Sequence, residues 1–291
     1  MPSADNTKGF FTIAQNTDTV DYVKLAYGLA LSLKHSQTSI SGLSIAITPG
    51  TTVDARYAWA FDQIIEIPWG DNAADKDWKL ENEWKTAWMS PYDETIKLDC
   101  DMLFFNDISR WWENLAQQDK HVICANTVLD WRGDLIKSDY CRKVFTGNQL
   151  PNIYTAFMYF RKSQEVFDFF ELAKYITWNW EKFFETMLEP STRPEYFSTD
   201  VAFALAMKIM DLDQSSYVPK ICPTFTHMKS RLQNWNVTTI TDNWLDHLTT
   251  YMSPNGSLKI GNHRQVYPLH YHVKEFLTDD IIKTYELLVQ K

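Results

Sequence analysis

The N-terminal part of the chain alternates between short apolar runs and longer amphipathic stretches. The apolar runs at 10–15, 43–48 and 64–67 predict buried strands, because each is short and stops at turn-forming residues. Between the first two runs, apolar side chains recur at helical spacing from Tyr22 to Leu33. Strands that alternate with helices predict a parallel sheet with crossover connections. None of these strands is followed by the glycine loop of a dinucleotide or P-loop site.

The rest of the chain continues this alternation. We expect further strands at 95–98, 122–125 and 153–160, and further helices at 53–61, 79–89, 108–116, 164–175, 199–210 and 279–289. The polar, mixed segment 127–148 is expected to be an insertion or lid. Because no linker or repeat divides the chain, we expect one α/β domain over residues 1–291, with a mixed, mostly parallel central sheet flanked by helices.

Two carboxylates stand at the end of one predicted strand. Asp99 and Asp101 follow the run 95–98, and a second apolar run, 102–105, begins directly after them. Two acids in such a place are costly to bury without a counter-charge. Hard divalent cations take carboxylate oxygens together with substrate phosphates, and ligand crevices in α/β sheets lie at the carboxyl ends of strands. The pair is therefore a candidate metal site, for which a surface acidic pair is the simpler alternative.

Composition narrows the class of partner. The chain has 12 Trp, 14 Tyr and 17 Phe, so aromatic side chains must line grooves or an interface as well as the core. The net charge of -9 disfavours a non-specific polyanion binder. A local basic cluster stands at Arg132, Lys137, Arg142 and Lys143, followed by Arg161 and Lys162. Solvated surface is the simpler interpretation of this cluster, and contact with phosphates is the alternative.

The cysteines and the ends of the chain bear on its environment. Cys100, Cys124, Cys141 and Cys222 show no C-x-x-C spacing, so we expect reduced thiols rather than a zinc ribbon or disulfide framework. Cys100 lies between two acids, and neighbouring negative charge raises the pKa of a thiol, so a redox role is not expected. The polar start and the lack of a long apolar stretch predict a soluble cytoplasmic protein without a membrane partner.

Three further motifs stand in a fixed order around the acidic pair. Lys85 precedes it, Asp200 opens the predicted helix 199–210, and the segment 269–274 (Leu-His-Tyr-His-Val-Lys) follows near the C-terminus. With these motifs the chain resembles the glycosyltransferases of the GT-A fold, most closely the glycogenin and galactosyltransferase-like family 8. It also resembles the family-8-related proteins of tailed phages, which implies the cytoplasm of a bacterial host. The resemblance runs from about residue 10 to residue 274.

The resemblance implies a metal-dependent site. Asp99 and Asp101 match the D-x-D pair that holds Mn²⁺ or Mg²⁺ against the donor diphosphate, with Asp99 also near the ribose. His270 matches the histidine that completes the metal shell, and Lys274 matches the lysine that meets the diphosphate. Because Lys274 stands closer to the histidine than in the family, His272 is an alternative metal ligand.

The resemblance also implies contacts to the donor and the acceptor. Lys85 matches a basic residue that contacts the donor, and Asp200 matches the acid near the sugar, so both are candidate catalytic residues. The nucleotide is expected at Ala14, Gln15, Asn16 and Tyr22. Residues 10–125 would then form a nucleotide-binding half and residues 126–291 an acceptor half.

The implied reaction is the transfer of a hexose or pentose from a nucleotide-sugar, expected to be UDP-linked, to an acceptor hydroxyl with retention of anomeric configuration. Val201 stands where the family has Gln, and residues 154–156 differ from the family's Asn-Ala/Ser-Gly segment, which leaves the sugar and the acceptor open. The acceptors considered are a hydroxymethylated base of phage DNA, a glycan, a protein and a small metabolite.

Two other functions compete with a transferase. A sugar-nucleotide pyrophosphorylase would carry a glycine-rich first loop with a basic residue, and residues 14–18 contain neither. A non-catalytic carbohydrate- or protein-binding module would use the aromatic side chains as a stacking groove. Such a module predicts no metal dependence and no release of nucleoside diphosphate.

Overall fold

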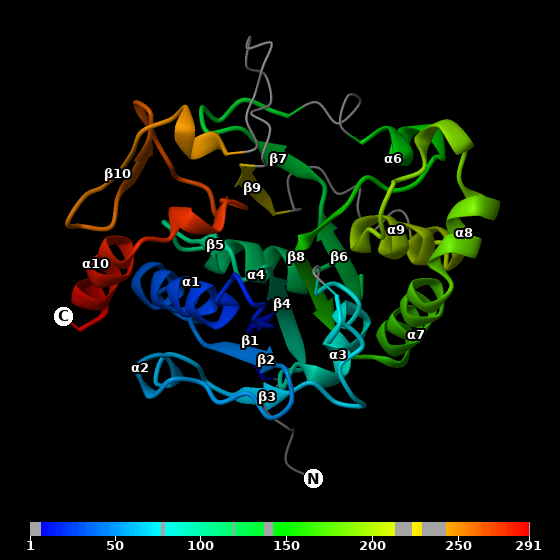
Figure 1. The fold of residues 1–291 in the computed structure, drawn as a ribbon, viewed down its shortest axis with the longest axis horizontal. Coiled ribbons are helices and arrows are strands. Elements are labelled where there is room, and N and C mark those ends of the chain that lie inside the picture. Colours follow the sequence, from blue (N-terminus) through cyan, green and yellow to red (C-terminus); the bar gives the residue numbers. More distant parts are fainter. Residues whose placement is uncertain are drawn as a thin grey trace.

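A central sheet carries most of the strands that the sequence predicts. The computed structural model describes residues 7–76, 79–118, 120–136, 142–212, 223–228 and 243–290 (Figure 1). The strands of the sheet are β1 (Lys8–Ile13), β2 (Leu43–Ile47), β3 (Ile64–Glu66), β4 (Glu94–Leu98), β6 (Val122–Ala125) and β8 (Tyr154–Arg161). Their order is β3-β2-β1-β4-β8-β6, in which β1 to β4 run parallel and β8 runs antiparallel to both neighbours. The expected mixed, mostly parallel sheet is confirmed.

Helices cover both faces of this sheet (Figure 1). One face packs against α1 (Tyr22–Ser36) and α4 (Ser109–Ala116), with α10 (Asp279–Val289) packed against α1. The other face packs against α3 (Thr86–Met89), α7 (Gln164–Trp178) and α9 (Thr199–Ile209). Along β8, Phe157 and Tyr159 belong to the first core, whereas Met158 and Phe160 belong to the second. This alternation is the two-residue period of a strand, so β8 is buried on both sides.

A second sheet connects the C-terminal segment to the acidic pair. Its strands are β5 (Met102–Leu103), β13 (Leu269–His270), β9 (Thr224–His227) and β7 (Thr127–Leu129), in that spatial order. β13 pairs antiparallel with β5, so that His270 lies opposite Met102. Because Met102 directly follows Asp101, this pairing brings a residue from the end of the chain to the end of β4. The strands β10 (Thr250–Met252), β11 (Leu258–Ile260) and β12 (His263–Arg264) form a separate small antiparallel sheet.

Several expected helices differ from those observed. The segment 79–89 contains a 3₁₀ turn over Glu83–Lys85 and the single-turn α3, because consecutive side chains there are buried and no polar helix face remains. The expected helix 53–61 shortens to α2 (Ala55–Ala58). The amphipathic helix α8 (Trp180–Met187) was not expected; Asn179 ends α7 and begins α8, which divides the helical stretch in two.

The segment 127–148 is not simply a polar insertion. It supplies β7 to the second sheet and contains α6 (Lys143–Gly147), while residues 137–141 lie outside the described residues. In the described part of the chain, no helix combines the length and the apolar character needed to cross a membrane.

Candidate functional site

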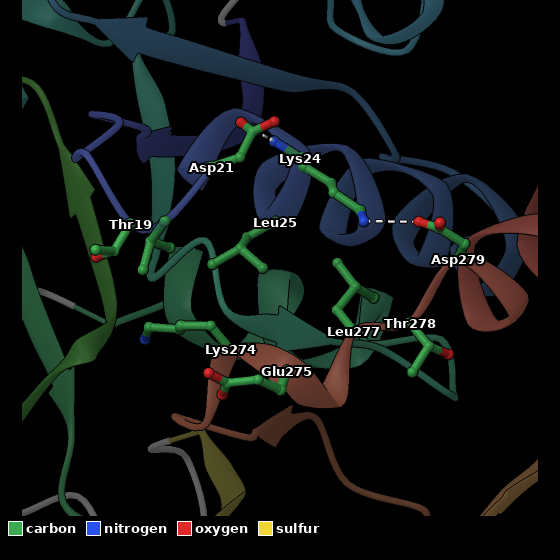
Figure 2. Close-up of a pocket in the computed structure, with 10 residues that line it drawn as sticks. Thr19, Asp21, Lys24, Leu25, Lys274, Glu275, Leu277, Thr278 and Asp279 are labelled. Carbon is green, nitrogen blue, oxygen red and sulfur yellow. Dashed lines mark hydrogen bonds and ion pairs between the residues drawn. The ribbon is translucent and has the colours of Figure 1, made fainter.

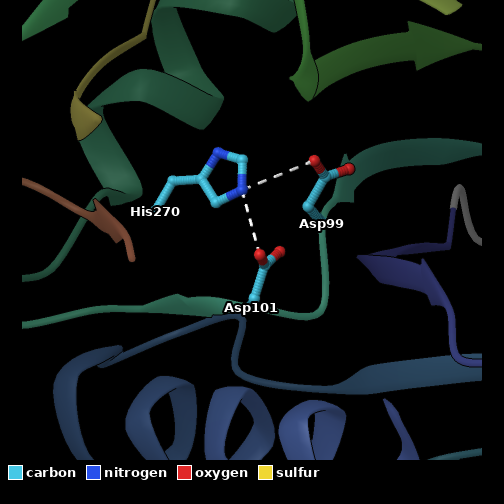
Figure 3. A group of neighbouring side chains, drawn as sticks. All are labelled: Asp99, Asp101 and His270. Carbon is cyan, nitrogen blue, oxygen red and sulfur yellow. Dashed lines mark hydrogen bonds and ion pairs between the residues drawn. The ribbon is translucent and has the colours of Figure 1, made fainter. Parts of the chain in front are cut away.

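Asp99, Asp101 and His270 meet just beyond the carboxyl end of β4 (Figure 3). One ligand atom from each lies within 4.8 Å of the others. His270 Nε2 is 3.2 Å from Asp101 Oδ2 and 3.9 Å from Asp99 Oδ2. The backbone N–H of Tyr271 donates to the carbonyl of Asp101 at 3.2 Å, which holds β13 against the acidic pair. Asp99 and Asp101 thus form one compact group in space with His270, which lies far from them in the sequence.

The donor set of this group fits a divalent cation. Two carboxylates suit Mg²⁺ or Mn²⁺, and an imidazole nitrogen supplies a third donor. Asp101 and His270 are buried, whereas Asp99 is partly exposed. The three side chains therefore present their donors towards one point at the edge of the core, and the identity of the cation stays a prediction.

Lys274 and His270 govern the charge of Asp101. Burial would raise the pKa of Asp101, but the charges of His270 and Lys274 outweigh burial and hold this pKa well below its usual range. The Lys274 ammonium donates to Asp101 Oδ2. Burial would lower the pKa of Lys274, but Asp101 raises it. For Cys100, between the two acids, burial and then the charge of Asp101 raise the pKa of the thiol well above its usual range, in the direction expected.

The group lies in a cleft of about 710 Å³. The candidate residues that line this cleft are Gln15, Tyr22, Asp99, Asp101, Asp200, His270, His272 and Lys274. Ala14, Asn16 and Lys85 are not among its lining residues. The structure therefore brings together most of the predicted site around the end of β4.

Gln15 is the centre of a polar network at one end of the cleft. Its amide nitrogen donates to Asp71 Oδ2 at 2.8 Å and to Thr48 Oγ1 at 3.0 Å, and its amide oxygen accepts from Asn82 at 2.8 Å. Asp71 also accepts from Asn82 at 2.6 Å. Asp71 and Asn82 were not predicted as site residues, and they fix the orientation of Gln15.

The other residues of the predicted nucleotide loop have structural contacts. The backbone N–H of Ala14 donates to Ala46 at 2.8 Å, and the side chain of Asn16 accepts from the N–H of Val23 at 3.0 Å, in the first turn of α1. Tyr22 lines the cleft, and Lys274 Nζ lies 5.6 Å from the centre of its ring. The role of these residues in nucleotide binding stays a prediction.

Lys85 is directed away from the cleft. Its side chain is fully buried, and its ammonium donates to the carbonyl of Gly70 and lies 5.3 Å from the centre of the Trp84 ring. Burial lowers the pKa of Lys85. In this structure the lysine supports the turn that leads to Asp71, and its predicted contact with the donor stays untested.

Lys97, which is not among the predicted site residues, also lines the cleft. Its ammonium is 2.9 Å from Glu83 Oε2, 2.8 Å from Asp99 Oδ1 and 3.3 Å from the carbonyl oxygen of Thr155. Burial would lower the pKa of Lys97, but Asp99 and Glu83 raise it, so the side chain is charged. An ammonium group has three N–H donors, and three acceptors surround this one. A lysine between Ile96 and Leu98, two residues before an acid, is the sequence signal that points to such a buried pair.

Asp200 is held by two partners. Arg142 Nη1 lies 2.8 Å from Asp200 Oδ2, while the backbone N–H and the hydroxyl of Thr155 donate to Oδ1 at 2.9 and 2.7 Å. Ser198, not Asp200, caps α9. Burial would raise the pKa of Asp200, but Arg142 and then Thr155 lower it. The carboxylate is therefore charged, and both of its oxygens already accept hydrogen bonds.

His270 and His272 do not continue one strand. β13 ends at His270, and His272 has a positive φ of 56°, so the alternation that would put both rings on one face is broken. Both side chains line the cleft, with ring centroids 6.2 Å apart. The group of metal-ligating atoms in the described residues includes His270 and not His272. The geometry favours His270.

A second cavity of about 440 Å³ lies beside the cleft (Figure 2). It is bounded by the start of α1 and the segment that leads into α10, where Lys24 Nζ is 2.6 Å from Asp279 Oδ1. Lys274 lines both cavities. The side chain that neutralises Asp101 thus borders open space on two sides.

The arginines of the predicted basic cluster form ion pairs with acids of the same chain. Arg132 lies 2.8 Å from Asp130, Arg142 pairs with Asp200, and Arg161 Nε lies 3.6 Å from Glu94. Lys143 is exposed on α6, and Lys137 lies outside the described residues. The three arginines of this cluster therefore do not form an open phosphate-binding surface.

Comparison with known proteins identifies the fold. No protein-family model and no curated protein sequence matches the chain. A solved structure of an active-site mutant of LgtC is similar at 12% identity, with a TM-score of 0.52, over 96% of this chain and 94% of that chain. The galactosyltransferase LgtC in complex with donor and acceptor sugar analogues is similar at 10% identity, with a TM-score of 0.50, over 97% and 95% of the two chains. At such identities the likeness shows the fold, which is the GT-A fold of glycosyltransferases.

Proposed function

We propose that the protein is a metal-dependent glycosyltransferase that moves a sugar from a UDP-sugar to an acceptor hydroxyl. The observation that carries this proposal is the group of Asp99, Asp101 and His270, whose ligand atoms lie within 4.8 Å of one another in a cleft at the carboxyl end of β4. The GT-A fold, shared with a galactosyltransferase solved with donor and acceptor sugar analogues, supports the same class of reaction.

In this proposal one half of the chain binds the donor nucleotide and the other half binds the acceptor. Residues 10–125 bind the nucleotide, with Ala14, Gln15, Asn16 and Tyr22 holding the base, Asp99 near the ribose, and Lys85 on the donor side. Residues 126–291 bind the acceptor. The position of Gln15 and Tyr22 in the same cleft as Asp99 supports this division.

The leaving group needs charge stabilisation. When bound, Mn²⁺ or Mg²⁺ would supply Lewis-acid stabilisation of the departing diphosphate. Lys274 adds a mobile positive charge, since its ammonium contacts Asp101 and its side chain borders two cavities. A flexible ammonium suits contact with phosphate oxygens as they gain charge. Lys274 would then exchange Asp101 for the diphosphate as the donor binds.

Retention of configuration agrees with the charges in the cleft. Among the described residues, each acid lining the cleft lies near a cation: Glu81 near Lys76, Glu83 and Asp99 near Lys97, Asp101 near Lys274, and Asp200 near Arg142. For Asp101 and Asp200 the neighbouring cation lowers the pKa, which makes each a weak general base. Burial raises the pKa of Glu83, but Lys97 lies 2.9 Å from its carboxylate. We therefore propose that the acceptor attacks from the side of the departing diphosphate. A phosphate oxygen then takes the acceptor's proton as the bond from sugar to phosphate breaks, and Asp200 orients the reacting groups.

The acceptor side of the cleft is aromatic. Trp180, Tyr196 and Phe197 line it, and Tyr196 is 72% exposed. Flat faces of this kind suit a ring-shaped acceptor. The phage resemblance adds hydroxymethylated DNA bases to the candidates, whereas the net charge of -9 and the paired arginines favour a glycan or a small molecule.

The test is turnover of a panel of UDP-sugars with and without Mn²⁺, measured as UDP release and by mass spectrometry of products. Each donor is paired with hydroxymethylated DNA, oligosaccharides and small acceptors. We expect metal-dependent release that falls by at least about 10²-fold in Asp101→Asn. The matched control is Asp107→Asn. Asp107 lies outside the cleft and accepts hydrogen bonds from the backbone N–H groups of Thr38 and Ser109. Metal-independent binding of sugars without UDP release from any donor would favour the non-catalytic module instead.

A further inference from the structure

β9 brings a second histidine, His227, directly beside His270. The two strands β9 and β13 pair in parallel with His227 opposite His270, and the N–H of Met228 donates to the carbonyl of His270 at 2.9 Å. The ring centroids are 4.8 Å apart, and the two Nδ1 atoms are 3.1 Å apart. His227 is buried, at 8% exposure. The contact between the rings is therefore set by backbone pairing inside the second sheet.

The two nitrogens of His270 face different partners. Nε2 faces Asp99 and Asp101 (Figure 3), and Nδ1 lies 3.1 Å from Nδ1 of His227. A neutral imidazole has one N–H donor and one acceptor nitrogen. If Nε2 gives its lone pair to a cation, the ring proton must sit on Nδ1. At 3.1 Å this Nδ1–H donates to Nδ1 of His227, which must then carry its own proton on Nε2.

We propose that His227 is a positioning residue for the metal ligand His270. By accepting the hydrogen bond from Nδ1–H of His270, it fixes the tautomer and the ring orientation in which Nε2 points at the two acids. This inference rests on the proposed function, because it requires the group of Asp99, Asp101 and His270 to bind a divalent cation. The outer nitrogen of a metal-binding histidine ordinarily donates to a carboxylate, a carbonyl or water. In this chain a second imidazole performs that task.

A purely structural role for His227 makes different predictions. Its ring also packs against Phe225 and Tyr154, with centroids 5.7 and 5.8 Å away. The change His227→Asn keeps an acceptor oxygen near the position of Nδ1, whereas His227→Leu keeps bulk and removes the acceptor. Phe225→Leu is the matched control, because Phe225 packs on both imidazoles and its loss leaves the bond between their nitrogens.

The first test measures Mn²⁺ affinity of the full chain by electron paramagnetic resonance of the unbound ion. We expect His227→Leu to bind Mn²⁺ about 10–100-fold more weakly than the wild type, and His227→Asn and Phe225→Leu to stay within about threefold. Equal affinity of the wild type and His227→Leu would overturn the inference and leave the proposed metal site intact. Equal weakening by all three variants would also overturn it in favour of packing. Absence of Mn²⁺ binding by the wild type would overturn both proposals.

A second test needs no variant. Nitrogen-15 spectra of the histidine side chains in the Mg²⁺-loaded wild type report which ring nitrogen carries the proton. We expect the proton of His270 on Nδ1 and that of His227 on Nε2. A proton on Nε2 of His270 in the loaded protein would overturn the inference even if His227→Leu did not fold.

Discussion

Arg142 and Asp200 form an ion pair of 2.8 Å that ties the first turn of α9 to the segment before β8. The same guanidinium donates to Asn152 and to the carbonyl of Ile153, and it stacks on the rings of Phe145 and Tyr154 at 4.0 and 3.9 Å. Asp200 therefore has a fixed orientation and a neutralised charge. Such a carboxylate is suited to orienting a substrate hydroxyl and less suited to attacking the sugar.

A double-mutant cycle on this pair tests its strength. Removing one partner leaves the other buried charge without compensation, so Asp200→Asn and Arg142→Met are each expected to destabilise the fold. We expect a coupling of about 0.5–3 kcal/mol, because the double variant removes both charges together. Urea unfolding of the wild type and the three variants measures it. Additive losses in the double variant would show that the two side chains do not depend on each other.

If Asp99, Asp101 and His270 bind a cation, the cation should increase the stability of the folded chain. A divalent cation that binds the folded chain at about one hundred times its dissociation constant should stabilise it by about 2.7 kcal/mol. We therefore expect Mn²⁺ to raise the melting temperature of the wild type and not that of Asp99→Asn. Asp99 is the suitable position because its side chain is 33% exposed and because the amide oxygen of Asn can still accept a hydrogen bond from Lys97. An equal rise in both proteins would place the bound cation elsewhere.

The lowered pKa of Asp101 predicts a specific dependence of stability on pH. Its folded pKa lies well below the unfolded value of about 3.9, so the unfolded chain binds more protons between these two values. The stabilisation by ionised Asp101 is complete above about pH 4 and is lost as the pH falls towards the folded pKa. Urea unfolding in EDTA should show a difference between the wild type and Asp101→Asn that shrinks below about pH 4. If the difference in the free energy of unfolding between the two proteins did not change with pH, ionised Asp101 would not be the source of the stabilisation.

The aromatic lining of the cleft predicts that one substitution there changes acceptor binding and leaves the donor reaction unchanged. Tyr196 lines the cleft and is 72% exposed, so Tyr196→Ala removes contact area with little cost to the core. We expect the KM for the acceptor to rise about tenfold, which corresponds to about 1.4 kcal/mol of lost contact. Slow hydrolysis of the donor without acceptor should be unchanged. A parallel loss of hydrolysis would indicate that Tyr196 contacts the donor.

Local patterns in the sequence predict much of the fold. The run 43–48 identifies β2, and the amphipathic pattern of the last residues identifies α10 with the bounds Asp279–Val289. The acidic pair is also local, since its two residues lie one apart at the end of a strand. These features are predictable because each depends on neighbours within a few residues.

The supporting contacts of the site are not local. His227 and His270 are 43 positions apart, and Arg142 and Asp200 are 58 apart, so only strand pairing and packing bring them together. The direction of Lys85 towards Gly70 likewise depends on how the turn near Trp69 packs, where Trp69 itself has a positive φ of 59°. A pattern of residue types identifies candidate ligands, but the side chains that orient them are set by tertiary structure.

Lys97 provides the most direct test of the buried charges in the cleft. Its side chain is 2% exposed and that of its partner Glu83 is 10% exposed. Lys97→Met would leave Glu83 buried without its cation, and we expect a loss of about 3–5 kcal/mol in the free energy of unfolding. The double variant Glu83→Gln/Lys97→Met should recover part of this loss, because it removes the uncompensated charge as well.

Urea unfolding measures both variants, with Arg56→Met as the control. Arg56 pairs with Asp54 at 2.7 Å in an exposed position, so its loss should leave the unfolding midpoint unchanged. If Lys97→Met shifts the midpoint no more than this control, Glu83 must be compensated by water or by a bound proton, since burial already raises its pKa. Such a result would still be compatible with Lys97 orienting Asp99 at 2.8 Å, because a buried ion pair can fix a geometry while it contributes little net stability.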